Sequence, residues 1–286
     1  MDTDEETRVR QIRRIIFANE PDREHEFKLS EESYNQLRTD SYPRLLYDWT
    51  RQVITIVTAP TDLHEDTSTA ILSSIYDRVT SIMQHLATIH SPTILVDTGH
   101  SRYEMEPDGA IYFETVDARD YKIIIEVGVS QAYNSLFDKA RKWIIDNTCD
   151  LVILLAFNEK YRYSAPRQRI FLSPHESKAQ IVQMRRHLRS PSYPKFRELE
   201  FLGHIWFHEL SHAFIEVVRK APSFDGTDDL MRSKYVLVEN GINKSSSVPR
   251  SIGNVRLAEL IPAVSHNNED IGIIYQPIFI TPSEMG

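Results

Sequence analysis

The spacing of apolar side chains predicts alternating helices and strands through the middle of the chain. Between 68 and 89 apolar residues recur every three or four positions, as on one face of an amphipathic helix, and this spacing returns at 132–146. Short segments rich in β-branched residues lie between the two and are typical of strands: 93–97, 108–114 and 121–130. A continuous apolar run at 150–157 indicates a strand buried on both faces.

This order of helix, three strands, helix and strand predicts an α/β fold with a mixed central sheet flanked by helices. Residues 1–60 precede it and are rich in charge, so we expect a charged helical N-terminal arm there. The segment 61–222 holds the core. Residues 223–286 are polar and turn-rich with short strand-like pieces, which predicts a β-rich C-terminal extension packing on the core.

The composition is that of an ordinary globular protein, with 286 residues, 41% of them hydrophobic and 26% charged. A net charge of −8 gives no overall attraction to nucleic acid or to an anionic membrane. No apolar run approaches the roughly 20 residues that span a bilayer. The single cysteine, Cys149, excludes an internal disulfide and suits a reducing compartment. We therefore expect an intracellular protein of the nucleus or cytoplasm, with no membrane partner.

A basic block interrupts this acidic chain. Between 160 and 197 there are ten lysines or arginines and one acid, Glu176. The block is either a solvated helix face with loops or a track for the phosphate backbone of nucleic acid. In the second case nucleic acid is the partner, and the expected contact residues are Arg167, Arg169, Arg185, Arg186 and Arg189.

The stretch FHELSHAF contains H-E-x-x-H, the zinc motif of helical metallopeptidases. In that motif His208 and His212 would bind Zn²⁺ from one helix face, and Glu209 would serve as the general base. No extended motif with a third ligand follows, and the flanking residues alternate as they do in strands. A zinc metallopeptidase is therefore kept as an alternative function.

A second constellation lies upstream, where Asp108 opens one predicted strand and Glu126 lies near the end of the next. If the two strands pair, the carboxylates can meet at a shared edge and hold a divalent cation. Hard oxygen ligands of this kind suit Mg²⁺ or Mn²⁺. Such an ion can activate water and stabilise charge on a phosphoryl oxygen.

The residues around this acid pair resemble a known superfamily. Pro107-Asp108, then EVGVSQ at 126–131, then a helix carrying Lys139 and Trp143 look like the PD-(D/E)XK nucleases, and most of all like the restriction-endonuclease-like proteins of fungi. The resemblance covers 92–157, about a quarter of the chain. It implies a restriction-endonuclease-like fold and hydrolysis of phosphodiester bonds in nucleic acid, with DNA favoured over RNA.

The resemblance also implies roles for particular residues. Asp108, Glu126 and the backbone carbonyl of Val127 would hold Mg²⁺ or Mn²⁺, and Gln131 would belong to the catalytic set. AFIEVVR, at 213–219, resembles a late strand of the fungal proteins. That placement counts against a helix through H-E-x-x-H, because a strand spreads His208 and His212 too far apart for one zinc ion.

The sequence departs from the family pattern at Gly128, where a lysine is expected two residues after Glu126. Some relatives carry this lysine on the following helix, and Lys139 occupies that place. The other interpretation is that the charge is lost and the domain binds without cutting. Sequence selectivity and a homodimeric state stay open.

Overall fold

The computed structural model describes residues 3–18, 24–38, 43–57, 62–79, 86–114, 119–129, 131–146, 148–161, 178–180, 182, 198–201, 204–221, 230–244, 251–256 and 270–274. The chain divides into two compact units. The first is Met1–Val127, Asp138–Ile153 and Val218–Met231, and the second is Gly128–Phe137, Leu154–Val217 and Arg232–Gly286. These units do not coincide with the predicted division at 60 and 222.

Helices and strands alternate in the first half of the chain, and the second half is rich in strands. The helices are α1 (Thr3–Ala18), α2 (Glu31–Leu37), α3 (Asp62–Val79) and α4 (Tyr133–Ile145). The strands of the first half are β1 (Glu24–Lys28), β2 (Arg44–Asp48), β3 (Val53–Val57), β4 (Leu86–His90), β5 (Ile94–Asp97), β6 (Arg102–Met105), β7 (Gly109–Glu114) and β8 (Arg119–Val129). Those of the second half are β9 (Leu151–Glu159), β10 (Leu199–Phe201), β11 (His204–Phe207), β12 (Leu210–Lys220), β13 (Leu230–Glu239), β14 (Ile242–Asn243), β15 (Ser251–Arg256) and β16 (Asp270–Ile274).

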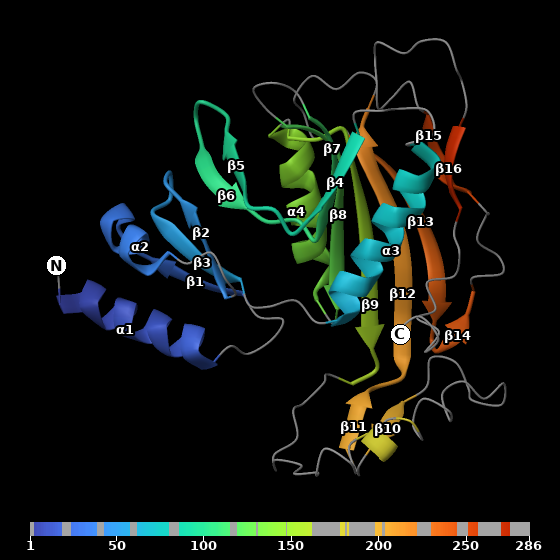
Figure 1. Ribbon diagram of the computed structural model, residues 1–286, viewed down its shortest axis with the longest axis horizontal. Helices are drawn as coiled ribbons and strands as arrows, with labels where there is room; N and C mark the ends of the chain where they lie inside the picture. The colour runs from blue at the N-terminus through green and yellow to red at the C-terminus, as the bar shows by residue number, and fades with distance from the viewer. Residues whose placement is uncertain are drawn as a thin grey trace. The chain divides into compact units, whose positions relative to one another are not determined.

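These strands form two large sheets and two short pairs (Figure 1). One sheet has five strands in the order β1-β3-β2-β6-β5. The other has seven in the order β14-β13-β12-β9-β8-β7-β4, and the pairs are β10-β11 and β15-β16. The fold is therefore α/β, as predicted.

The N-terminal segment corrects the predicted helical arm. Only α1 matches the predicted arm. After it, the described residues between 24 and 57 form three strands and the short helix α2. These elements enclose a hydrophobic core of their own: Ile12, Leu29, Tyr34, Leu37, Leu45, Tyr47, Ile54 and Ile56. At its N-terminal end α2 is capped by Ser30, whose hydroxyl accepts a hydrogen bond from the Ser33 amide.

The predicted helix 68–89 is also corrected at its end. The helix α3 stops at Val79, and Leu86–His90 is the strand β4, which pairs with β7 in antiparallel register. The predicted strand 93–97 exists as β5, but it pairs with β6 in the five-stranded sheet. The other predicted elements are confirmed within a few residues as β7, β8, α4 and β9.

The seven-stranded sheet is mixed. Strands β7 and β8 are antiparallel. The starts of β8 and β9 lie together, since the Asp150 amide donates to the Lys122 carbonyl at 3.3 Å, so this pair runs parallel through the crossover helix α4. The end of β9 lies beside the start of β12, where the Ser211 hydroxyl donates to the Asn158 carbonyl at 2.9 Å.

Helices cover both faces of the β7–β8 pair. A Cβ atom on Gly109 would lie 2.8 Å from Leu72 of α3, so α3 packs closely on the face to which Gly109 and its partner Ile125 belong. On the other face, Trp143 of α4 contacts Glu126. Because both faces are covered, Ile123, Ile124, Ile125 and Val127 are all buried.

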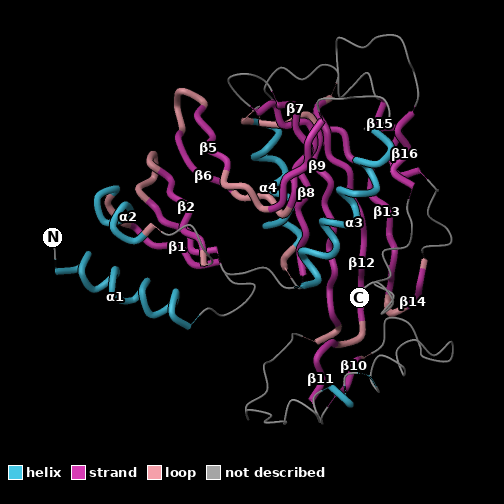
Figure 2. The backbone as a smooth tube through the Cα atoms, viewed as in Figure 1, coloured by secondary structure: helices cyan, strands magenta, loops and turns pink. Residues whose placement is uncertain are grey.

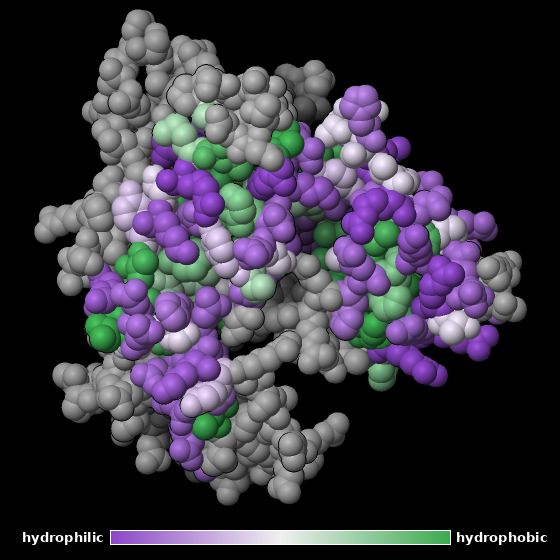
Figure 3. Space-filling view, turned by 180° about the vertical axis from the view of Figure 1, so that it is seen from behind, coloured by the Kyte–Doolittle hydropathy of each residue, from purple (hydrophilic) through white to green (hydrophobic). Residues whose placement is uncertain are grey.

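The C-terminal part is strand-rich, as predicted, with β13 to β16 following β12 (Figure 2). None of the helices among the described residues is both long and apolar enough to cross a membrane. The face in Figure 3 carries mostly hydrophilic side chains with hydrophobic patches of limited extent between them.

Candidate functional site

Asp108 and Glu126 lie at the same end of two paired strands. Asp108 immediately precedes Gly109, the first residue of β7, which pairs with Ile125 of β8. Side chains alternate along strands, so Asp108 and Glu126 both belong to the sheet face opposite Gly109 and Ile125. This is the face covered by α4. The strand pairing predicted from the sequence is therefore present.

Asp108 is half-buried and held by the backbone of β8. Its Oδ2 accepts a hydrogen bond of 2.5 Å from the Val127 amide, and its own amide donates to the Ile125 carbonyl at 3.1 Å. Its carbonyl accepts from the Ser91 amide at 3.4 Å. These contacts fix the Asp108 carboxylate against the end of β8. The donor is the backbone N–H of Val127, and the carbonyl of the same residue is the group expected to bind metal.

Glu126 is a buried carboxylate, only 2% exposed. Its Oε1 accepts a hydrogen bond of 2.6 Å from the indole nitrogen of Trp143, which is itself fully buried. A buried carboxylate is costly unless it has hydrogen-bond or charged partners, so this bond stabilises Glu126 and also fixes its orientation. Strand β8 brings the acid into the interior, and α4 supplies its donor.

Lys139 lies on α4 one turn before Trp143, so the two residues are neighbours on the helix surface. The side chain is half-buried, beside the buried residues Leu136 and Ala140 of the same helix. The position of Lys139 as the lysine of the site stays a prediction.

Position 128 has little room for a side chain. A Cβ atom on Gly128 would lie 3.1 Å from Leu136 Cδ2 and 3.3 Å from Gln131 Oε1, which is tighter than ordinary van der Waals contact. Gln131 is in turn bonded through its amide to the Ser135 hydroxyl at 3.2 Å. The packing around α4 therefore disfavours a side chain larger than that of glycine at this position.

The carboxylates suit a hard divalent cation. The side chains of Asp108 and Glu126 are both carboxylates, the hard oxygen ligands that Mg²⁺ and Mn²⁺ take. Among the residues that the structure describes, no group of three or more His, Cys, Asp or Glu side chains is placed to hold a metal.

The H-E-x-x-H residues do not form a helix. His208 and Glu209 connect β11 to β12, and His212 lies within β12, so the strand implied by AFIEVVR is present. His208 lies 3.6 Å from Glu198, and Glu209 lies 3.6 Å from Lys160. The helical face on which a zinc peptidase places its two histidines is therefore not formed by these residues.

The five arginines expected to contact nucleic acid, Arg167, Arg169, Arg185, Arg186 and Arg189, lie outside the described residues. Their role stays a prediction.

One charged network was not anticipated from the sequence. Glu216 of β12 is buried, and it accepts hydrogen bonds from Tyr133 at 2.6 Å and from Arg232 Nε at 2.8 Å. Burial and the bond to Glu216 raise the pKa of Tyr133. The signal was a single acid within the apolar run AFIEVV, because an acid that faces a core requires partners there.

The comparisons with known proteins leave the family of this chain open. No protein-family model and no curated protein matches it. The chain is similar in structure to a candidate nuclease belonging to DUF820 from Anabaena variabilis ATCC 29413, known from a crystal structure. The sequence identity is 11%, the match covers 52% of this chain and 92% of the other, and the TM-score is 0.35.

Proposed function

We propose that this protein is a divalent-metal-dependent nuclease that hydrolyses phosphodiester bonds of nucleic acid, with DNA as the favoured substrate. The observation that supports this most is the position of Asp108 and Glu126 on one face at one end of the β7–β8 pair, each held by a hydrogen bond. The resemblance of the surrounding residues to PD-(D/E)XK nucleases gives this geometry its chemical interpretation.

In this proposal Asp108, Glu126 and the carbonyl of Val127 hold Mg²⁺ or Mn²⁺. When bound, such an ion polarises a phosphoryl oxygen and lowers the pKa of a coordinated water. The chain's own residues keep the site in place. The Val127 amide orients Asp108, and the Trp143 indole orients Glu126, so neither carboxylate has to reorganise before it binds a cation.

Lys139 is proposed to position the attacking water, and Gln131 to line the same site. The geometry supports Lys139 through its place one turn before Trp143 on α4. Gln131 is supported by its hydrogen bond to Ser135, which holds it at the start of that helix. The arginines of the basic block are proposed to contact the phosphate backbone, which gives affinity with little sequence reading.

The test is cleavage of plasmid, single-stranded DNA and RNA by purified protein in Mg²⁺, Mn²⁺ or EDTA. We expect cleavage that requires the metal and is lost in Asp108→Ala and Glu126→Gln. The matched control is Asp120→Asn, which removes an exposed carboxylate from the other end of β8 and should leave the rate unchanged. Cleavage that persists in Asp108→Ala would contradict the assignment of the site.

A second candidate function is nucleic-acid binding without catalysis. It is favoured by the packing around Gly128, where a side chain would require Leu136 or Gln131 to move, so the position disfavours the lysine of the PD-(D/E)XK pattern. In that case the folded protein would bind the same nucleic acids but cut none of them in either metal. Elemental analysis of the purified protein addresses the remaining alternative, because a zinc metallopeptidase would contain about one Zn²⁺ per chain.

A further inference from the structure

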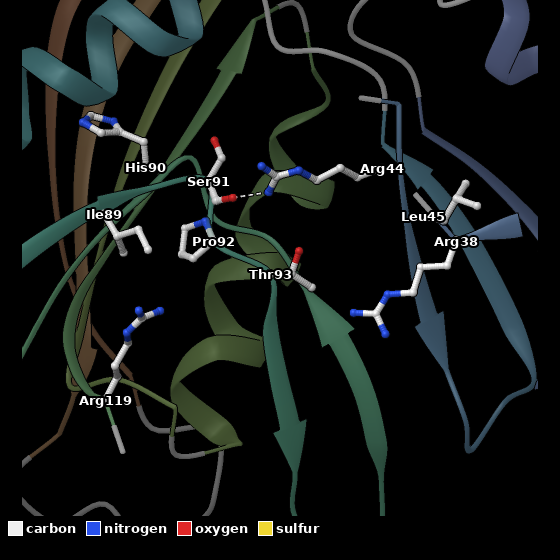
Figure 4. A pocket seen from close by; sticks show the side chains of 9 residues that line it. All are labelled: Arg38, Arg44, Leu45, Ile89, His90, Ser91, Pro92, Thr93 and Arg119. Atoms are coloured by element: carbon white, nitrogen blue, oxygen red, sulfur yellow. Dashed lines mark hydrogen bonds between the residues drawn. The ribbon is translucent and has the colours of Figure 1, made fainter. Parts of the chain in front are cut away.

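A pocket lined by three arginines lies beside Asp108. It has a volume of about 330 Å³, and it is lined by Arg38, Arg44, Leu45, Ile89, His90, Ser91, Pro92, Thr93 and Arg119. None of these described lining residues is a carboxylate. The guanidinium groups of Arg38, Arg44 and Arg119 come from different elements and point towards the segment 91–93 (Figure 4).

The backbone connects this pocket to the candidate metal site. His90 pairs with Gly109 across β4 and β7, and the next residue, Ser91, donates its amide to the Asp108 carbonyl at 3.4 Å. Ser91 has a φ of 42°, a left-handed conformation that is uncommon for residues other than glycine. This turn places the Ser91 carbonyl where Arg44 donates a hydrogen bond to it. One residue thus contacts both Arg44 and Asp108.

The arginines differ in how firmly they are held. Arg44 is mostly buried and lies 3.1 Å from Glu106, so its guanidinium has a fixed position. Arg38 is 52% exposed, with Glu104 at 3.6 Å. Arg119 is exposed and lies over the ring of Tyr112, 5.1 Å from its centroid.

The carboxylates paired with Arg38 and Arg44 lie behind the lining of the pocket. Glu104 also accepts hydrogen bonds from the Tyr34 hydroxyl and the Tyr47 amide, so its charge is shared with groups outside the pocket. Glu104 and Glu106 are both buried and neither lines the cavity. Three guanidinium groups therefore face an opening whose lining, among the residues that the structure describes, includes arginine but no acid. Arginine suits the planar, bidentate recognition of phosphate oxygens.

We propose that this arginine pocket binds a phosphate group. The chemistry could come from a free phosphate anion or from a phosphate of a polynucleotide strand. The choice of nucleic acid as the carrier rests on the proposed function. In that case a strand held here by one phosphate passes directly beside Asp108, and the pocket positions the strand for cleavage.

The test measures binding in EDTA, so it is independent of catalysis. Short fluorescein-labelled single-stranded and duplex DNA are titrated with wild-type protein and with the double variant Arg38→Gln/Arg119→Gln, and inorganic phosphate is used as a competitor. We expect the double variant to bind DNA about tenfold more weakly or worse, because two charge-assisted contacts are lost. The salt dependence should fall as well, by about one unit of slope per lost phosphate contact.

Arg51→Gln is the matched control. Arg51 is 58% exposed, belongs to the turn between β2 and β3, and does not line the pocket, so its loss should change the affinity little. Thermal unfolding of each variant checks that the fold is intact. If the double variant proves unstable, the single variant Arg119→Gln replaces it, because Arg119 is exposed and lies at the start of β8.

Competition between labelled DNA and inorganic phosphate distinguishes a site for the free anion from a site for the strand backbone. Competition by inorganic phosphate that disappears in the double variant indicates a site for the free anion. DNA binding that depends on the two arginines but resists inorganic phosphate indicates the strand backbone. Equal affinity of wild type and double variant for both probes, or no binding by wild type, overturns the proposal. If the wild-type protein cleaves DNA and the double variant binds DNA as tightly as the wild type, the phosphate pocket is refuted and the nuclease proposal stands. If DNA binding depends on the two arginines but no cleavage occurs, the nuclease proposal is refuted and the pocket stands.

Discussion

The indole nitrogen of Trp143 donates a hydrogen bond of 2.6 Å to Oε1 of Glu126, and both side chains are almost completely buried. Strand β8 and helix α4 are therefore joined through one of the proposed metal ligands. A carboxylate in such a position cannot replace a lost donor with bulk water, so the bond should matter both for stability and for the orientation of the site.

Replacing Trp143 by Phe keeps a ring in the core but removes the donor to Glu126. We expect the free energy of unfolding to fall by about 1–3 kcal/mol, the usual cost of leaving a buried polar atom without its bond. Urea denaturation measures this. The matched control is Trp49→Phe, because Trp49 donates to Glu31 in an exposed bond of 2.8 Å, and the loss should be smaller there. Equal losses would show that the buried bond has no special role.

Asp108 allows the charge of the site to be separated from its hydrogen bond. In Asp108→Asn the side-chain oxygen can still accept from the Val127 amide, whereas Asp108→Ala removes the acceptor. We expect both variants to lose Mn²⁺ binding, measured by calorimetry, since both lack the carboxylate. Only the alanine variant should lose about 1 kcal/mol of stability in addition. Mn²⁺ binding retained in Asp108→Asn would exclude the carboxylate as a ligand.

The sequence predicted the central elements well where the signal was local. The run at 150–157 is apolar throughout because β9 is covered on both faces, and the spacing at 132–146 reflects the buried face of α4. The sequence left the pairing of β7 with β8 as a condition, and the structure contains that pair. The expectation that Asp108 and Glu126 meet at one edge depended on this pairing.

The errors occurred where local patterns were ambiguous. The apolar positions of β4 continue the spacing of α3, so Leu86 and Ile89 were assigned to a helix. The high charge of the N-terminal segment favoured a helical arm, so the strand VITIV was not predicted. Its Ile54 and Ile56 are fully buried. The arginine pocket depends on contacts between distant residues, such as Arg44 with Ser91, which no local pattern encodes.

Gly128 should not tolerate even a methyl group well. We expect Gly128→Ala to lower the free energy of unfolding by about 1–3 kcal/mol, because Leu136 or Gln131 has to move to make room. A double-mutant cycle with Leu136→Ala measures the coupling, and the second substitution should relieve part of the strain. Additive effects in that cycle would show that Leu136 does not limit the space at this position.

Two buried tyrosines donate to carboxylates in the N-terminal unit. Tyr34 is fully buried and donates to Glu104 Oε2 at 2.7 Å, and Tyr103 donates to Asp146. Burial first, and then the bond to the carboxylate, raises the pKa of both phenols well above the usual value near 10. In the folded protein each therefore stays neutral at a pH at which the unfolded chain would ionise.

The sign of the resulting pH dependence follows from these raised pKa values. The stabilisation is fully present below pH 10, the pKa of an unfolded tyrosine, and is lost as the pH rises above it. We expect the free energy of unfolding, measured by urea denaturation at increasing alkaline pH, to decline above pH 10 and to decline less steeply in Tyr34→Phe. Tyr161→Phe, at a tyrosine that is 59% exposed, is the control and should leave the slope unchanged. An equally steep decline in Tyr34→Phe would mean that Tyr34 ionises as readily in the folded protein as in the unfolded chain.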